Sequence, residues 1–338
     1  MIRKLLAWKE LLKLGNVSYL RKEIDSFFFG IVLQALDKEG WFDFFREGKT
    51  EEQLIDNYGY TDIDFLSHLL DLLIKDNVLV RQEEMIYPKN IHYEVISPSI
   101  FSDSLTDIWK EHANFLPERL KGKYMEFTSG INLFNWDDAL ATKMYEQIRR
   151  SAFAFSGALR KQGNFLDVGC GNGYGTAAIW NYYYGKGSIE GMKLVGIDPS
   201  ETLLEIAKEE FWDFVRKHNP LIDGKIQTME LPEFIEGSAL HIPFEDATFD
   251  MVYASQVLHW TDTRKAIEEM LRVTKSGGMV FGTQNFYPNA NPYGEVLFFV
   301  VEGAGGFVTK EQFKEYAYEA GARKVEFATP ISIFKILK

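Results

Sequence analysis

Three glycines at every second position follow an acid near the middle of the chain, in the pattern Asp167-x-Gly169-x-Gly171-x-Gly173. Leu166 and the residues around it are apolar, so the pattern predicts a buried strand that ends in a glycine turn. Such a turn presents backbone N–H groups with no side chain in front of them, and a ligand can approach these groups closely. The spacing therefore predicts a site for a nucleotide-like molecule.

Two common nucleotide motifs do not fit this turn. A dinucleotide fold needs G-x-G-x-x-G, but Tyr174 stands where the third glycine would follow Gly169 and Gly171. A P-loop needs a lysine followed by serine or threonine, and none follows these glycines. A second acid, Asp198, ends the next apolar run, where a carboxylate can accept hydrogen bonds from both hydroxyls of a ribose.

The glycine pattern resembles motif I of the class I S-adenosylmethionine-dependent methyltransferases, and three further marks follow in the family's order. Asp198 takes the place of the family's ribose-binding acid, after a small insertion at 182–192. Residues 236–250 are similar to G-D-A-x-x-L-P-F-x-x-x-x-F-D, with Ser238 at the position of the adenine-binding aspartate. Residues 270–278 resemble L-R-V-L-K-P-G-G. The resemblance implies S-adenosylmethionine as cofactor and S-adenosylhomocysteine as product.

The resemblance also implies which residues contact the cofactor. Cys170 is expected to contribute backbone and volume to the turn and not a reactive thiol. A single cysteine excludes an internal disulfide and a multi-cysteine zinc site, and no metal ligand is expected. The implied cofactor-binding residues are Asp167, Gly169, Cys170, Gly171, Gly173, Asp198, Pro199, Ser238, Ala239 and Ser255.

Methyl transfer from a sulfonium is an in-line displacement, so a base is needed only where the acceptor must lose a proton. His259 is the candidate base, in a phrase Leu258-His259-Trp260-Thr261-Asp262 that resembles a region of the winged-helix O-methyltransferases. One residue of that region is missing here, and the family's catalytic histidine has no counterpart at 263–265. A packed, structural His259 is the alternative.

From residue 161 to 338 short apolar runs alternate with amphipathic ones, which predicts an α/β domain with a doubly wound, mostly parallel, seven-stranded, Rossmann-like sheet. A ligand is then expected at the carboxyl ends of the strands. Strands are predicted at 164–168, 193–197, 234–237, 250–254, 278–283, 324–328 and 331–337, and helices at 174–184, 200–217, 263–275 and 309–320.

Residues 1–100 are predicted to form a smaller, mainly helical domain. Thr50 and Gln53 make a capping box at the start of a helix, a second helix follows Thr61, and apolar runs at 78–81 and 85–87 predict a hairpin. This order suggests a winged-helix-like domain that dimerises or caps the site. Residues 101–160 are predicted to be a helical connector and a possible lid, rich in aromatic residues including Phe127, Phe134 and Trp136.

Charge argues against nucleic acid as a partner. The whole chain carries a net charge of −12, and residues 20–100 hold eight Lys or Arg against sixteen Asp or Glu. The sequence shows neither a signal peptide nor a membrane-spanning run. We therefore expect a cytoplasmic homodimer that methylates a small molecule, with oxygen or carbon favoured as the acceptor atom.

Two other classes of function are weighed against this one. A cofactor-sensing winged-helix regulator without catalysis is the main alternative. A protein methyltransferase is disfavoured, because the Asn/Asp-Pro-Pro-Tyr motif that handles amide nitrogens is absent where residues 255–258 stand.

Overall fold

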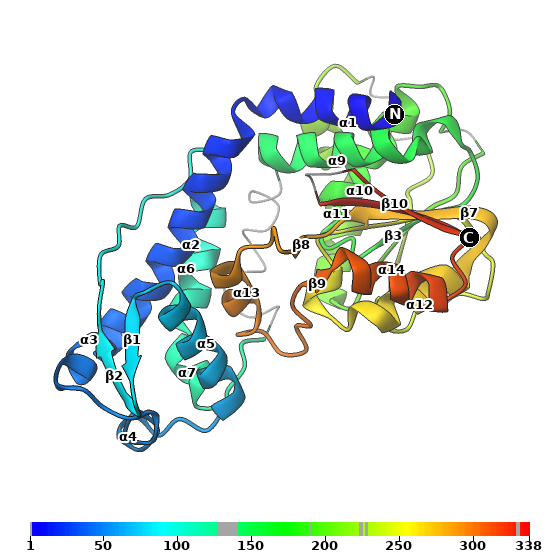
Figure 1. Ribbon diagram of the computed structural model, residues 1–338. Helices are drawn as coiled ribbons and strands as arrows, with labels where there is room; N and C mark the ends of the chain where they lie inside the picture. Colours follow the sequence, from blue (N-terminus) through cyan, green and yellow to red (C-terminus); the bar gives the residue numbers. More distant parts are fainter. Residues whose placement is uncertain (1, 127–140, 190, 223–225, 227–228, 329–331) are drawn as a thin grey trace. The chain divides into compact units, whose positions relative to one another are not determined.

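The structure is a computed structural model that describes residues 2–126, 141–189, 191–222, 226, 229–328 and 332–338. The chain forms two compact units (Figure 1). One consists of residues 1–17, 133–289 and 305–338 and is called the sheet unit below. The other consists of residues 18–132 and 290–304 and is called the helical unit.

The sheet unit is built on seven strands in the order β10-β11-β7-β6-β3-β4-β5. The five strands from β7 to β5 run parallel. At one edge β11 pairs antiparallel with both β7 and β10, so β11 alone opposes the direction of the other six strands. The predicted fold class is therefore confirmed. The strands span Phe165–Val168 (β3), Leu194–Asp198 (β4), Glu233–Glu236 (β5), Phe249–Ser255 (β6), Thr274–Thr283 (β7), Lys324–Ala328 (β10) and Ile333–Leu337 (β11).

Helices cover both faces of this sheet, which explains why its central strands are apolar on both sides. On one face, side chains from α9, α10 and α11 form an aromatic-rich core around Phe153 and Phe165. On the other face, α12 and α14 pack against Leu166, Val252 and Val280. These helices span Lys143–Ser156 (α9), Tyr174–Tyr184 (α10), Glu201–His218 (α11), Thr263–Val273 (α12) and Lys310–Glu319 (α14).

The strand order reverses direction at β3. The chain moves outward from β3 to β4 and β5, and then returns to the other side of β3 for β6 and β7. In open sheets of this kind, ligands bind beside the carboxyl ends of the strands at such a switch point. The glycine turn at 169–173 follows β3, so the topology places it at this point.

The helical unit begins with α2 (Val17–Glu39), the long helix in blue in Figure 1. Thr50 and Gln53 form the predicted capping box, in which each side chain binds the other residue's backbone N–H. The remaining elements are α3 (Trp41–Phe44), α4 (Glu51–Tyr58), α5 (Ile63–Lys75), the hairpin β1 (Leu79–Gln82) and β2 (Met85–Pro88), α6 (Asp103–Asn114), α7 (Leu116–Leu120) and α13 (Pro292–Phe298).

The compact units differ from the predicted domain boundaries at three places. Helix α1 (Ile2–Leu11) lies in the sheet unit, where it packs along α9 and Ser151 donates to the carbonyl of Ala7 at 3.0 Å. The predicted connector is divided, because α6 and α7 belong to the helical unit and α9 to the sheet unit. Phe127, Phe134 and Trp136 lie outside the described residues.

The third difference is an insertion into the helical unit from late in the chain. Residues 290–304 carry α13, which is held by side chains of the helical unit itself. His112 binds the carbonyl of Leu297 at 3.0 Å, and Arg119 donates to the carbonyl of Phe299 at 2.7 Å. These contacts join residues about 180 positions apart, which no local sequence pattern could indicate. No helix among the described residues is long and apolar enough to cross a membrane.

Candidate functional site

The glycine turn after β3 has the open backbone that its sequence predicts. All three glycines have positive φ angles, +67° at Gly169, +55° at Gly171 and +79° at Gly173. A Cβ atom at Gly169 would stand 2.5 Å from Val257, so this position has no room for a side chain. A Cβ atom at Gly171 would meet no atom of the described residues within 4 Å. The turn therefore faces open space at Gly171, where a ligand can reach the backbone.

Asp198, at the end of β4, is joined directly to this turn. Its Oδ2 accepts the N–H of Gly171 at 2.9 Å, and its Oδ1 accepts the N–H of Ser200 at 3.0 Å. The carboxyl group is buried, and this burial raises its pKa while the two N–H donors lower it. The turn and the acid are therefore in direct contact, which the sequence did not indicate, and each oxygen keeps a lone pair for a ligand.

Asp167 lies behind the turn, in β3. It is buried, and Oγ1 of Thr176 in α10 donates to its Oδ2 at 2.6 Å. Burial raises its pKa to about 7, against the opposing effects of Thr176 and Arg149. Asp167 therefore links the strand to the first turn of α10, and it carries a proton over much of the acidic range.

We expect Asp167→Asn to change how the stability of the protein depends on pH. A folded-state pKa near 7 means that the folded protein binds this proton more tightly than the unfolded chain, whose aspartate has a pKa near 4. The wild type should therefore lose stability, relative to the variant, by about 2 kcal/mol between pH 5 and pH 7. Urea unfolding without cofactor measures this difference. The assignment would be contradicted if the difference in free energy of unfolding between wild type and variant were the same at pH 5 and at pH 7.

A pocket of 340 Å³ opens beside Asp198, at the carboxyl ends of β4 and β5. The predicted residues Pro199 and Ser238 line it, together with Glu236, Gly237, His241 and Pro243. Oγ of Ser238 accepts the N–H groups of Leu240 and His241, each at 3.2 Å. Because both contacts use its oxygen as an acceptor, Ser238 has its hydroxyl hydrogen left to donate. Ala239 is buried next to it.

Ser255 and His259 follow β6. Oγ of Ser255 bonds to Oγ1 of Thr283 at 2.8 Å, which ties the ends of β6 and β7 together. His259 is buried, and its Nδ1 lies 3.2 Å from Oε1 of Gln284. Burial lowers the pKa of His259 to about 4, so the ring is neutral near pH 7. Its ring packs against Trp260 and Phe307, and its carbonyl accepts the N–H groups of Gly305 and Gly306.

Cys170 is buried inside the glycine turn. Its Sγ would lie 2.9 Å from a Cβ atom placed on Gly196, so the thiol fills space between β3 and β4. Burial raises its pKa, which keeps the sulfur protonated and unreactive. Among the residues that the structure describes, no group of three or more His, Cys, Asp or Glu is placed to hold a metal ion.

Several residues of this region are not indicated by the sequence. Thr176 and Gln284 are the partners of Asp167 and His259, and neither belongs to a motif. Arg272 belongs to the motif at 270–278, but the motif does not indicate that it binds the loop lining the pocket. The signal that the sequence offers is the residue type, because a guanidinium can bind several planar acceptors at once.

Known proteins resemble this chain in sequence and in fold. Residues 166–282 match a family model described as a methyltransferase domain. Demethylmenaquinone methyltransferase of Staphylococcus aureus is 34% identical over 131 residues, which are 38% of this chain and 46% of that protein. The chain spans less than half the length of the curated relatives it matches first.

Solved structures share the fold over nearly the whole chain. The CurJ carbon methyltransferase matches with a TM-score of 0.70 at 14% identity, covering 97% of this chain and 95% of that one. Human N-acetylserotonin methyltransferase, solved with S-adenosylmethionine, matches with a TM-score of 0.50 at 16% identity, covering 96% and 98%. Residues 166–282 therefore form a methyltransferase domain, and these solved structures share its fold. The class and the cofactor predicted from the motifs are confirmed.

Proposed function

We propose that this protein transfers a methyl group from S-adenosylmethionine to a carbon or oxygen atom of a small-molecule acceptor. The observation that carries the proposal is the contact between Asp198 and the N–H of Gly171, at the edge of a pocket that β4 and β5 form together. This contact joins a backbone cradle to a carboxylate and a polar pocket. A nucleoside with a charged amino-acid tail needs these three features.

Each part of the cofactor is assigned to a different part of the site. We assign the ribose hydroxyls to the two oxygens of Asp198, the base to the pocket beside Ser238, and the amino-acid tail to the turn at 169–173. The donor hydrogen of Ser238 suits a ring nitrogen of the base better than its amino group. When bound, the cofactor supplies the electrophilic methyl group, and these residues hold it still while water is excluded.

For His259 we propose a structural role. A ring with a pKa of about 4 is a weak proton acceptor at neutral pH, and its polar contacts already tie β6 to Gln284 and to the glycines at 305 and 306. In this proposal the acceptor atom is already deprotonated when the methyl group is transferred, as in an enolate or a phenolate, so the transfer relies on positioning and the protein supplies no dedicated base.

The quaternary state and location belong to the same proposal. Two helices followed by a hairpin, α4, α5 and β1–β2, support a winged-helix-like unit, and this resemblance supports a homodimer. The acidic composition and single cysteine support a location in the cytoplasm.

Calorimetry with S-adenosylmethionine and S-adenosylhomocysteine tests the cofactor, and radiolabelled S-adenosylmethionine with fractionated small molecules tests the transfer. We expect binding of both compounds and label in at least one fraction. Absence of binding would refute the proposal. Binding without transfer to any fraction, together with salt-sensitive retention on DNA, would favour a cofactor-sensing regulator instead.

A further inference from the structure

The loop between β5 and β6, residues 237–248, supplies most of the wall of the pocket. Gly237, Ser238, His241 and Pro243 all lie on it. The contacts within the pocket end of this loop are local: His241 donates to the carbonyl of Ser238 at 3.1 Å, and Oγ of Ser238 accepts the N–H groups of Leu240 and His241 at 3.2 Å each. Gly237 also donates to the carbonyl of Asp198 at 3.1 Å. A loop outside the seven-stranded sheet needs contacts from another element to keep one shape.

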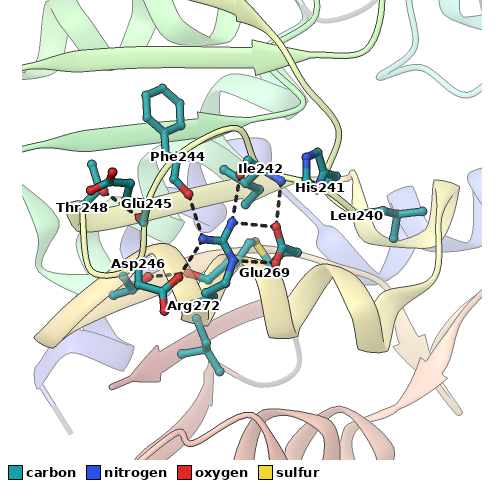
Figure 2. Close-up of polar contacts among 12 residues, drawn as sticks. Leu240, His241, Ile242, Phe244, Glu245, Asp246, Thr248, Glu269 and Arg272 are labelled. Carbon is teal, nitrogen blue, oxygen red and sulfur yellow. Dashed lines mark hydrogen bonds and ion pairs between the residues drawn. The ribbon is translucent and has the colours of Figure 1, made fainter.

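Arg272 in the last turn of α12 provides those contacts (Figure 2). Its Nη2 donates to the carbonyl of Ile242 at 2.9 Å, and its Nη1 donates to the carbonyl of Phe244 at 2.8 Å and to Oδ1 of Asp246 at 2.9 Å. All three acceptors lie on the loop. A planar guanidinium can satisfy such a set of acceptors at once, which a lysine cannot.

Glu269, one turn earlier on α12, completes the arrangement. Its Oε1 accepts a hydrogen bond from Nε of Arg272 at 2.7 Å, and its Oε2 accepts one from Nη2 of Arg272 at 2.9 Å. The same Oε2 also accepts the N–H of Ile242 at 2.8 Å. Both backbone groups of Ile242 are therefore bound by charged side chains of α12. The contact with Arg272 lowers the pKa of Glu269, which keeps the carboxylate ionised at neutral pH.

Ile242 stands between two residues of the pocket wall. His241 precedes it and Pro243 follows it, and both line the pocket. The side chain of Ile242 is buried in the core between the sheet and α12. A change in the position of its backbone would therefore move both neighbours, while the glycine turn and Asp198, on β3 and β4, would stay in place.

We propose that Arg272 and Glu269 are positioning residues for base recognition: they fix the loop at Ile242 and so set the shape of the pocket wall that reads the cofactor's adenine. This inference rests on the proposed function, since it assumes that the pocket takes the base of S-adenosylmethionine. Neither residue lines the pocket or binds Asp198 or the glycine turn, so their effect should fall on the base alone.

The test compares two ligands that differ only at the base. S-adenosylhomocysteine carries a 6-amino group and an N1 that accepts a hydrogen bond, whereas S-inosylhomocysteine carries an oxygen at position 6 and a hydrogen on N1. We expect wild type to prefer the adenine compound. In Arg272→Lys the Kd for S-adenosylhomocysteine should rise on the order of tenfold, and the preference over the inosine compound should fall towards one. Calorimetry measures both constants.

Glu269→Gln is the second variant, because it keeps the side-chain shape and should reproduce the loss of preference even where Arg272→Lys is poorly folded. Arg264→Lys is the matched control. Arg264 lies on the same helix and pairs with Glu268 and Glu319, away from the loop, so both constants should stay at their wild-type values.

Three results would overturn the inference: no preference in wild type, an equal rise of both constants in the variants, or unchanged constants. A general loss of stability would raise both constants together, so the ratio separates positioning from folding. Failure of wild type to bind either compound would refute the proposed function itself. Binding by wild type with an unchanged ratio in both variants would refute only the positioning role.

Discussion

Replacement of Asp198 with alanine should reduce the affinity for S-adenosylhomocysteine by about 100-fold or more, which corresponds to ~2.7 kcal/mol. The variant loses the acceptors that we assign to the ribose, and a hydrogen bond to a charged group contributes about 1.5–3 kcal/mol. It also leaves the N–H groups of Gly171 and Ser200 without their partner, which loosens the turn. Calorimetry with the purified variant measures the change.

Two further variants make this result specific. Asp198→Asn keeps the shape of the side chain and one acceptor oxygen, so its affinity should lie between those of the wild type and the alanine variant. Asp213→Ala removes an exposed aspartate of α11 whose partner is Arg216, and it should bind as wild type does. Wild-type affinity in Asp198→Ala, or an equal loss in Asp213→Ala, would contradict the assignment.

The second large effect is expected from a single methyl group at Gly171. A Cβ atom there meets nothing among the described residues, so Gly171→Ala should fold, at a backbone cost of about 1–2 kcal/mol for its φ of +55°. The space that the methyl group enters is the space that we assign to the cofactor. We therefore expect affinity for S-adenosylhomocysteine to fall by about 100-fold.

Gly187→Ala separates the backbone cost from the loss of space. Gly187 follows α10 and has a φ of +63°, and a Cβ atom placed on it would also meet no described atom within 4 Å. Both variants should lose similar stability in urea unfolding, but only Gly171→Ala should lose cofactor affinity. Equal affinities in the two variants would show that the cofactor does not approach Gly171.

Most of the sheet unit could be predicted because its signals are local. The predicted helix at 174–184 agrees with α10 at both ends, and each predicted strand lies within three residues of an observed one at its start, apart from β7, which begins at Thr274. A strand buried on both faces is apolar throughout, and the loops around it contain glycine or polar residues. The capping box at Thr50 is likewise complete within four residues.

The two units could not be delimited in the same way. Helix α1 is amphipathic whichever unit it covers, and its sequence does not say that its partner is α9. The segment 290–304 joins the helical unit through Arg119 and His112, far away in the chain. Such assignments depend on which apolar surfaces meet after folding, and neither periodicity nor caps encode that.

The sequence by itself determined the cofactor. The spacing of Asp167, Gly169 and Gly171 determines the backbone conformation of the turn, and the order of the motifs determines which strand ends carry the polar groups. Both features therefore follow from local sequence. Tertiary structure decided what these groups contact. It paired Asp198 with the N–H of Gly171, lowered the pKa of His259 by burial, and brought Arg272 to Ile242. Contacts and burial depend on elements far apart in sequence, and these exist only once the sheet and its helices have packed.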